Sequence, residues 1–476
     1  MTHLTTDAAR TQKRHWYAAG FLFIAAFINL LDTTIVNLAL PAIQTEFGAT
    51  DTAMQWVLVI YVLAFAAGLL PFGRFGDAIG RRKLFLCGIV GFVTTSLVCG
   101  VAPNMETLIV ARLLKGMCAA IMLPQVLAII HATFPNDLKG KAIGYFGMVS
   151  GLGALAGPLI GGPLIAADLF GLGWRMIFLI NLPLGVISFV GVSAYVSRDL
   201  KTRKQSSDWF GAGLFATGSV ALLYPLIEGR SSGWPLELLA LFFVSVLLFA
   251  VFWQRQKKLA TNNEMQLVPV KLLSNGRFLS GLIITNCLFI GVAGPIVVLA
   301  ITLQSGLGFS AAEAGLVLAA HPLAAMFTSL ATGQMSPRYL QWRILFGFVA
   351  LLVGMISLRG IVPFSGGPLT LWGPLFLIGA GVGSANVALF QSVLRTVEPS
   401  DAGAGSGALQ ALQQIGIAVS IAIVGQIFFS SLTQENNAEH YVAALQKSLL
   451  LPIAIYAGLT FATLRTLIKE DSKHDA

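Results

Sequence analysis

Apolar runs of about 20 residues, separated by short segments that collect the charges, divide almost the whole chain. A helix that crosses a bilayer needs roughly this length, whereas a β-barrel would show alternating segments of about ten residues. Only 11% of the residues are charged, against about 25% in soluble domains, so lipid must surround most of the chain. The sequence therefore predicts an all-α membrane protein with 14 transmembrane helices. The expected spans are 16–40, 54–72, 84–102, 107–130, 142–166, 175–197, 209–227, 235–254, 278–302, 312–333, 343–361, 369–394, 404–430 and 449–468.

The basic residues test this count and orient the chain. With a cytoplasmic N-terminus, 24 of the 30 Lys and Arg residues fall on the cytoplasmic side, as the positive-inside rule requires. Both termini are therefore predicted to be cytoplasmic, and the protein to be a multi-pass protein of the inner (plasma) membrane. The net charge of +9 is spread over short loops and forms no continuous basic face, which argues against a nucleic-acid partner.

Charged segments at 198–208 and 255–277 divide the helices into six, two and six. We expect an N-terminal six-helix bundle at 1–197, two inserted helices with cytoplasmic linkers at 198–277, and a C-terminal six-helix bundle at 278–476. Within the second linker, residues 268–274 fit a short amphipathic helix on the bilayer surface.

The chain shows no grouping of residues typical of an enzyme. The four cysteines lack metal-ligand spacing, and no nucleophile constellation, phosphate-binding loop or ATPase motif occurs. We therefore expect no enzymatic activity, no cofactor and no metal. The energy for any transport must then come from an ion gradient or from the gradient of the substrate itself.

Three ionisable residues are predicted deep inside apolar runs: Asp32, Arg112 and Lys115. Such residues are costly in hydrocarbon and usually face protein or water. Arg112 and Lys115 share one helix face, and the helical rise places Asp32 and Lys115 at about the same depth, roughly 12 Å from the outer ends of their helices. An ion pair of Asp32 with Lys115 or Arg112 would either fix two helices or couple transport to protonation of Asp32.

Other polar groups at membrane depth are weaker candidates. His321 is either a second proton carrier or a hydrogen-bonding partner of a neighbouring helix. Seven further side chains would line a substrate cavity or simply join helices: Asn29, Trp56, Tyr61, Gln125, Asn286, Asn386 and Gln391.

Two glycine-rich motifs indicate where the backbone turns or packs closely. The first contains Gly73, Asp77, Gly80, Arg81 and Arg82 between the second and third spans. Its glycines would permit a tight turn, and Asp77 among the arginines would form a charged latch, unless the segment is an ordinary basic loop.

The second motif lies in span 142–166 and contains Gly153, Gly157, Pro158, Gly161 and Gly162. Glycines at four-residue spacing leave a flat helix face, and proline permits a bend. Static packing and a hinge or proton seal both fit this pattern.

These motifs resemble those of the major facilitator superfamily, and in particular its fourteen-helix drug:proton antiporters. The matching segments are Gly73–Lys83, Leu31–Pro41, Arg112–Gly116, Gly153–Gly162 and Trp174–Gly185. The resemblance implies two six-helix bundles related by a pseudo-twofold axis, with two inserted helices. Two positions depart from the family pattern: Lys115 stands where Gln is usual, and Pro337 stands where the second-half motif has an acid.

The resemblance also implies a proton-coupled antiporter that exports small organic compounds or drugs by alternating access. A proton-coupled importer, or a carrier of metabolites or organic anions with the same fold, is the alternative. The partners expected are a small-molecule substrate, protons and the lipid bilayer, with the protein acting as a monomer. One buried acid against two buried bases favours neutral, zwitterionic or anionic substrates over dications.

Overall fold

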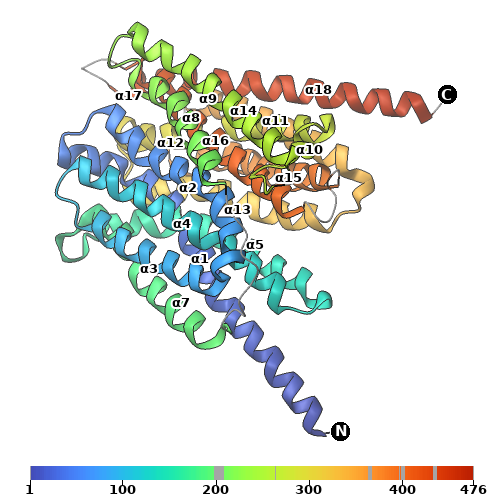
Figure 1. The fold of residues 1–476 in the computed structure, drawn as a ribbon. Helices are drawn as coiled ribbons and strands as arrows, with labels where there is room; N and C mark the ends of the chain where they lie inside the picture. The colour runs from blue at the N-terminus through green and yellow to red at the C-terminus, as the bar shows by residue number, and fades with distance from the viewer. Residues whose placement is uncertain are drawn as a thin grey trace.

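The computed structural model describes residues 2–197, 208–262, 264–362, 367–395, 397, 402–432 and 437–474. The elements assigned within these ranges are all helical, and 14 of the helical segments are long and apolar enough to cross a membrane. The predicted fold class and helix count are therefore confirmed. Figure 1 shows the helices running roughly alongside one another, with α1 projecting at the N-terminus and α18 at the C-terminus.

The first set of helices covers the first six predicted spans. Its members are α1 (Thr2–Phe47), α2 (Asp51–Ile79), α3 (Arg81–Gly100), α4 (Met105–Thr133), α5 (Asn136–Ala166), and the consecutive α6 (Met176–Leu179) and α7 (Asn181–Tyr195). The inserted pair consists of α8 (Trp209–Glu228) and α9 (Leu236–Thr261).

The last set covers the remaining six spans. The short α10 (Val270–Leu273) precedes α11 (Gly276–Ile290), α12 (Ala293–Ile301), α13 (Ala311–Gln334), α14 (Leu340–Ile361), α15 (Trp372–Leu394), α16 (Ala402–Phe429), α17 (Ala438–Ser448) and α18 (Leu450–His474). α11 and α12 form one span that ends in a π-helical turn, Thr302–Gly306.

The boundary between α2 and α3 corrects one sequence prediction. We expected Gly73 and Gly80 to shape a loop, but α2 continues through Gly73 to Ile79 and α3 begins at Arg81. Gly80 alone makes the turn, with a φ of 110°, which residues with a side chain rarely adopt. Gly73 is an interior helix residue because uninterrupted backbone hydrogen bonding is favoured in a protein interior surrounded by lipid.

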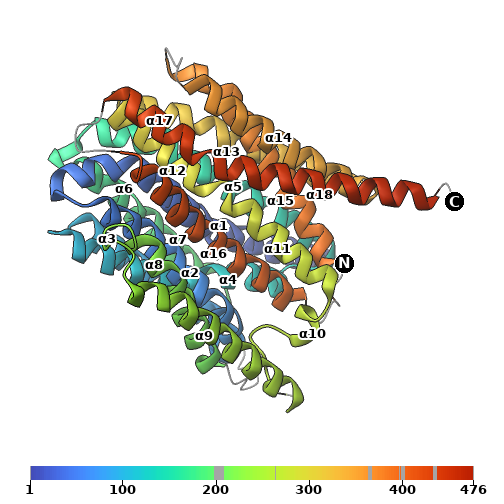
Figure 2. The same cartoon turned by 90° about the horizontal axis from the view of Figure 1, so that it is seen from above.

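Helix packing connects the two sets at defined places. Within the first set α1 packs on α5 and α7, and α4 packs on α2 and α3; within the last set α15 packs on α13 and α14. Between the sets, α5 packs on α13 and α2 packs on α16. The inserted helix α8 contacts both α2 and α16 (Figure 2).

Candidate functional site: a buried charge cluster

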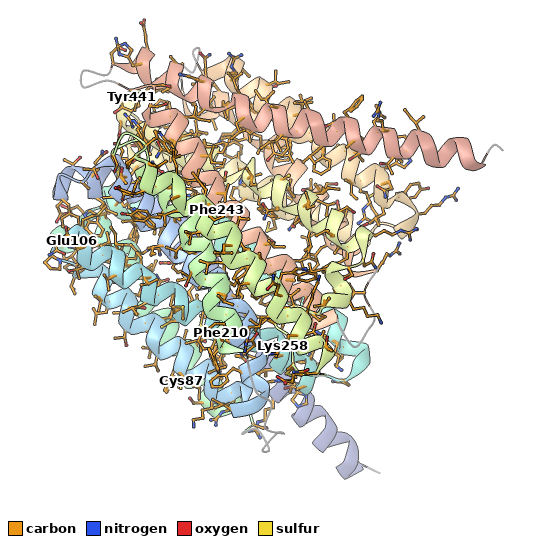
Figure 3. The ribbon with its side chains drawn as sticks, turned by 45° about the horizontal axis from the view of Figure 1, so that its top comes forward. Cys87, Glu106, Phe210, Phe243, Lys258 and Tyr441 are labelled. Carbon is orange, nitrogen blue, oxygen red and sulfur yellow. The ribbon has the colours of Figure 1, made fainter. Side chains whose placement is uncertain are left out.

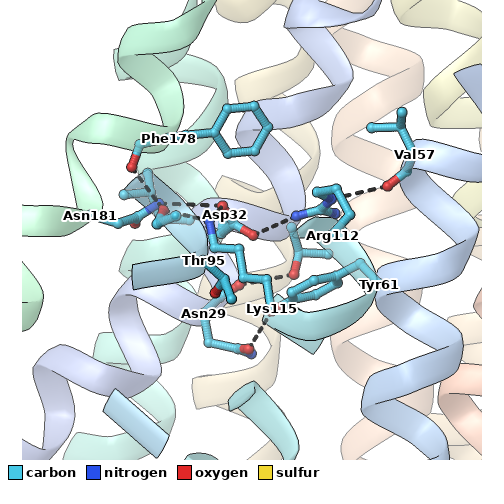
Figure 4. Close-up of polar contacts among 12 residues, drawn as sticks. Asn29, Asp32, Val57, Tyr61, Thr95, Arg112, Lys115, Phe178 and Asn181 are labelled. Atoms are coloured by element: carbon cyan, nitrogen blue, oxygen red, sulfur yellow. Dashed lines mark hydrogen bonds and ion pairs between the residues drawn. The ribbon is translucent and has the colours of Figure 1, made fainter. Parts of the chain in front are cut away.

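A carboxylate from α1 lies between two bases from α4. Arg112 Nη1 is 2.7 Å from Asp32 Oδ2, and Lys115 Nζ donates a hydrogen bond to Asp32 Oδ1. No more than 1% of any of these three side chains is exposed. The predicted ion pair is therefore present and includes both bases, because residues three apart on α4 face the same side of the helix (Figure 4).

The positive charge in excess of the single carboxylate is stabilised by other groups. Arg112 Nε donates to the carbonyl of Val57 at 3.0 Å, and the guanidinium lies 4.1 Å from the centre of the Tyr61 ring. Lys115 Nζ donates to Ser96 Oγ at 2.7 Å. Its ammonium also lies 4.7 Å from the centre of the Phe92 ring, so cation–π attraction supplements the hydrogen bonds.

Two residues that the sequence reasoning did not single out complete the cluster. Asn181 Nδ2 donates to Asp32 Oδ1 at 3.3 Å and to Ser96 Oγ at 3.2 Å. Asn181 Oδ1 is buried and accepts no hydrogen bond within the described part of the chain. Asn181 lies in the family-like segment Trp174–Gly185 but had no predicted role, and Ser96 is one of many polar residues in apolar runs. Only the fold shows which of them meet.

The cluster lies inside the first set of helices. Its side chains come from α1, α2, α3, α4 and α7, with Tyr61 donating to Asn29 Oδ1 at 2.8 Å as the link between α2 and α1. Asn29 and Tyr61, predicted to bind substrate, are both at most 2% exposed. The charges thus contact one another and not an open surface, and the preference for neutral, zwitterionic or anionic substrates stays a prediction.

Four of the other predicted substrate-binding residues join helices. Trp56 Nε1 donates to Glu228 Oε1 at 2.9 Å, and Gln125 Nε2 donates to the carbonyl of Phe72 at 2.9 Å. The remaining two are Asn286, which donates to the carbonyl of Leu412 at 2.8 Å, and Gln391, which accepts from Arg343 Nη2 at 2.6 Å. In this structure these four side chains therefore join helices, which was the alternative to lining a substrate cavity.

His321 and Asn386 keep unused polar atoms. His321 Nε2 and Asn386 Oδ1 are buried and have no hydrogen-bond partner within the described ranges. The carbonyl of His321 lies 2.1 Å from where a Cβ on Gly379 would be, so α13 and α15 touch through backbone at this level. Buried polar atoms without partners are uncommon and mark sites at which a ligand, water or proton can bind.

The basic residues after Gly80 bind the ends of neighbouring helices. Arg81 Nη1 donates to the carbonyl of Ala128 at 2.8 Å, and Arg82 Nη2 donates to the carbonyl of Ser193 at 2.6 Å. These acceptors lie near the C-termini of α4 and α7, where cations are favourable. The side chain of Asp77 lies outside the described residues, so the latch remains a prediction.

The glycines of α5 allow it to fit between α1 and α13. A Cβ on Gly157 would lie 1.9 Å from Thr34 Oγ1, while one on Gly162 would lie 2.3 Å from the carbonyl oxygen of Ala311. Gly153 and Gly161 face α1 in the same way, with would-be Cβ contacts of 2.5 Å to the Phe27 carbonyl and 2.4 Å to Ile35 Cγ1. The carbonyl of Pro158 is 2.2 Å from a would-be Cβ on Gly315 of α13. The motif therefore forms two close helix contacts, and one of them connects the two sets.

The inserted helix α8 bridges the two sets near its C-terminal end. Glu228 accepts from Trp56 of α2, and the neighbouring carbonyl of Ile227 accepts from Gln426 Nε2 of α16 at 2.7 Å. At its other end, Trp209 packs edge-on against Phe72 and Phe75 of α2. The inserted pair is thus attached along α2, with a hydrogen bond to α16 at one end.

The Arg343–Gln391 bond gives a stability prediction. Arg343 is 3% exposed, and Gln391→Met would leave its guanidinium with one longer bond among the described residues, at 3.3 Å to the carbonyl of Met335. We expect a loss of about 1.5–3 kcal/mol, because a hydrogen bond to a buried charge is lost. Thermal unfolding in detergent would measure it. Gln304→Met is the matched control, since among the described residues the Gln304 amide donates to the carbonyl of Ala300 one turn earlier in the same span, and it should change stability by less than about 0.5 kcal/mol. Equal effects of the two changes would contradict the prediction.

A fourteen-helix membrane bundle with buried charges and close glycine contacts between its two sets of helices is the architecture of a polytopic membrane transporter. The sequence model of the Major Facilitator Superfamily matches residues 22–421, and the chain belongs to this family. It is accordingly a transporter and not an enzyme.

Curated relatives extend over most of the chain. A probable actinorhodin transporter of Streptomyces coelicolor is 35% identical and covers 89% of this chain and 74% of its own. A riboflavin transporter of Clostridioides difficile is 30% identical over 91% of this chain and 92% of its own. A puromycin resistance protein of Streptomyces alboniger is 33% identical over 87% of this chain and 82% of its own.

Solved structures share the fold. The crystal structure of a bacterial homologue of the human lysosomal transporter Spinster, in an inward-facing and unoccupied conformation, matches with a TM-score of 0.66. The match covers 96% of this chain and 98% of that one, at 18% sequence identity. At this identity the likeness shows the fold alone.

Proposed function

We propose that this chain is a proton-driven antiporter that exports small organic compounds across the inner membrane, with both termini in the cytoplasm. The observation that carries the proposal is the Asp32 carboxylate, which is fully buried and bound to two bases of a neighbouring helix. Relatives named for antibiotic transport and resistance support the substrate class.

The charge cluster has the properties needed for coupling. Protonation of Asp32 would remove the negative charge that attracts Arg112 and Lys115, and it would weaken the attachment of α1 to α4. Loss of the proton would restore both contacts. A buried group with two alternative electrostatic environments can thus couple proton binding to a helix rearrangement. His321, with its unused Nε2, is a second candidate carrier in α13.

The contacts between the two sets of helices would supply the conformational change. α5 meets α13 through Gly162 and Gly315, where a Cβ on either glycine would meet the backbone of the other helix. Such flat surfaces part and re-form at low cost compared with interdigitated side chains. Alternating access would open and close this contact together with the one between α2 and α16.

Flux measurements in reconstituted vesicles test the proposal. Vesicles with an acidic interior should accumulate puromycin or a related organic compound, since an antiporter exchanges outgoing protons for incoming substrate. Dissipating the pH gradient with an ionophore should stop the accumulation. Uptake that ignores the pH gradient for every compound tried would overturn proton antiport.

A second candidate is a carrier of metabolites, favoured by the similarity to a riboflavin transporter. The same vesicles distinguish it. A proton symporter would accumulate riboflavin when the exterior is acidic, whereas an antiporter requires an acidic interior. Accumulation of riboflavin only under an acidic exterior would replace the first proposal by the second.

A further inference from the structure

A groove of about 760 Å³ lies between α3 and α7, away from the charge cluster. Its wall is formed mainly by apolar side chains, among them Leu86, Val90 and Phe189, and its one cysteine, Cys87, is exposed. Figure 3 places Cys87 on the outer side of the molecule. Both helices belong to apolar membrane-spanning segments, so the groove faces the surrounding lipid.

The two helices explain where the groove begins. They are in close contact at Gly185, where a Cβ would lie 2.2 Å from Val93 Cγ2. At the start of α3, Arg82 lines the groove and donates to the carbonyl of Ser193 on α7 at 2.6 Å. The groove therefore has a closed apolar end near Gly91 and a basic end at Arg82 and Lys83.

The length of the groove corresponds to one leaflet of a bilayer. Gly91 is nine positions after Arg82 on α3, which is about 13 Å along a helix. The hydrocarbon core is about 30 Å thick, so one leaflet contributes roughly 15 Å. An acyl chain lying in the groove would thus have its headgroup beside the basic end.

The charges at that end select the headgroup. Lys83 is exposed, and Arg82 also lines the groove while it donates to the carbonyl of Ser193. The first turn of α3 adds backbone N–H groups, which also favour an anion. Among the described residues that line the groove, none is acidic. An anionic headgroup would be attracted to this basic end more strongly than a zwitterionic one, because the amine of a zwitterionic headgroup offsets the charge of its phosphate.

We propose that this groove is a binding site for an anionic phospholipid of the cytoplasmic leaflet, with the acyl chain against Leu86, Val90 and Phe189 and the phosphate held by Lys83 and Arg82. The assignment does not depend on proton coupling or on the direction of transport. It requires only that α3 and α7 stand in a bilayer with the basic end at the headgroup level.

Lipid retention measures the site directly. The purified full-length chain would be exchanged into micelles that contain equal amounts of phosphatidylglycerol and phosphatidylcholine with the same acyl chains, and native mass spectrometry would count bound lipids. We expect retained phosphatidylglycerol to exceed phosphatidylcholine in the wild type. Lys83→Gln should reduce that preference about fivefold, the effect of one cation at a membrane surface.

Two further variants separate the groove from general surface charge. Val90→Trp fills the apolar wall without altering any charge, and it should abolish the preferential retention. Lys258→Gln removes an exposed cytoplasmic cation at the end of α9 and should leave retention unchanged. Thermal unfolding of each variant in lipid-free micelles shows whether it is folded, so a folding defect is not mistaken for lost binding.

Photocrosslinking locates the lipid. Phosphatidylglycerol that carries a diazirine in its acyl chain should label the peptide containing Leu86 and Cys87 in the wild type but not in Val90→Trp. Equal retention of the two lipids, an equal loss with Lys258→Gln, or labelling confined to other helices would each overturn the assignment.

Discussion

Asp32→Asn is expected to abolish proton-dependent transport and to lower the free energy of unfolding by about 3–5 kcal/mol, because it leaves Arg112 and Lys115 buried without an anion. The substitution preserves the shape of the side chain. It removes the one acid to which both bases are bound, at 2.7 Å in the case of Arg112. The effect should be among the largest of any single substitution in the chain.

A double variant separates stability from coupling. Asp32→Asn with Lys115→Gln removes one charge of each sign, so the cluster keeps the net charge of the wild type. We expect it to regain much of the lost stability, measured by thermal unfolding, while substrate flux in vesicles stays independent of the pH gradient. Proton-driven flux at wild-type rates in either variant would show that Asp32 has only a structural role.

Gly157→Val is expected to have the second large effect, since it places a branched side chain where α5 meets α1. A Cβ alone would lie 1.9 Å from Thr34 Oγ1 and 3.0 Å from the backbone nitrogen of Ile35. Overpacking of a tight contact costs about 1–3 kcal/mol and occasionally more. Because Thr34 is close to Asp32 on α1, the shift of α1 should also disturb the charge cluster. We expect low yield of folded protein and little transport.

Gly147→Val on the same helix is the control. A Cβ at Gly147 meets nothing within 4 Å, so the same change in side chain and helix propensity occurs without the clash. Folded yield, from size-exclusion chromatography, and vesicle flux should stay near wild type. If both valine variants behaved alike, the loss would reflect helix propensity and not the α1–α5 contact.

Much of the fold followed from properties that are local in the sequence. The length of each apolar run sets whether it spans hydrocarbon, and the basic residues between runs indicate which ends share a side, so 14 spans were predictable without tertiary information. The Asp32–Arg112–Lys115 contact was also predictable. Charges are rare and costly in hydrocarbon, and only three were expected deep in the spans.

The roles of neutral polar residues could not be predicted from the cost of burial in the same way. An amide at membrane depth fits a substrate site and a helix–helix bond equally well, and the partner lies far away in sequence. The partner of Trp56 is 172 residues away at Glu228, and that of Gln391 is 48 residues away at Arg343. The position of the turn between α2 and α3 was not predictable either. Gly73 and Gly80 both permit a tight turn, and only the structure shows that α2 continues to Ile79 and turns at Gly80.

The sequence alone thus determined how many helices cross the membrane and which charges they bury, because the cost of polar groups in lipid acts on each segment independently. The tertiary structure alone decided which neutral side chains meet. It brought Ser96 and Asn181 to the buried carboxylate, placed α5 between α1 and α13, and left a groove between α3 and α7. Those features depend on the relative rotation and spacing of helices, which the packing of the whole bundle fixes.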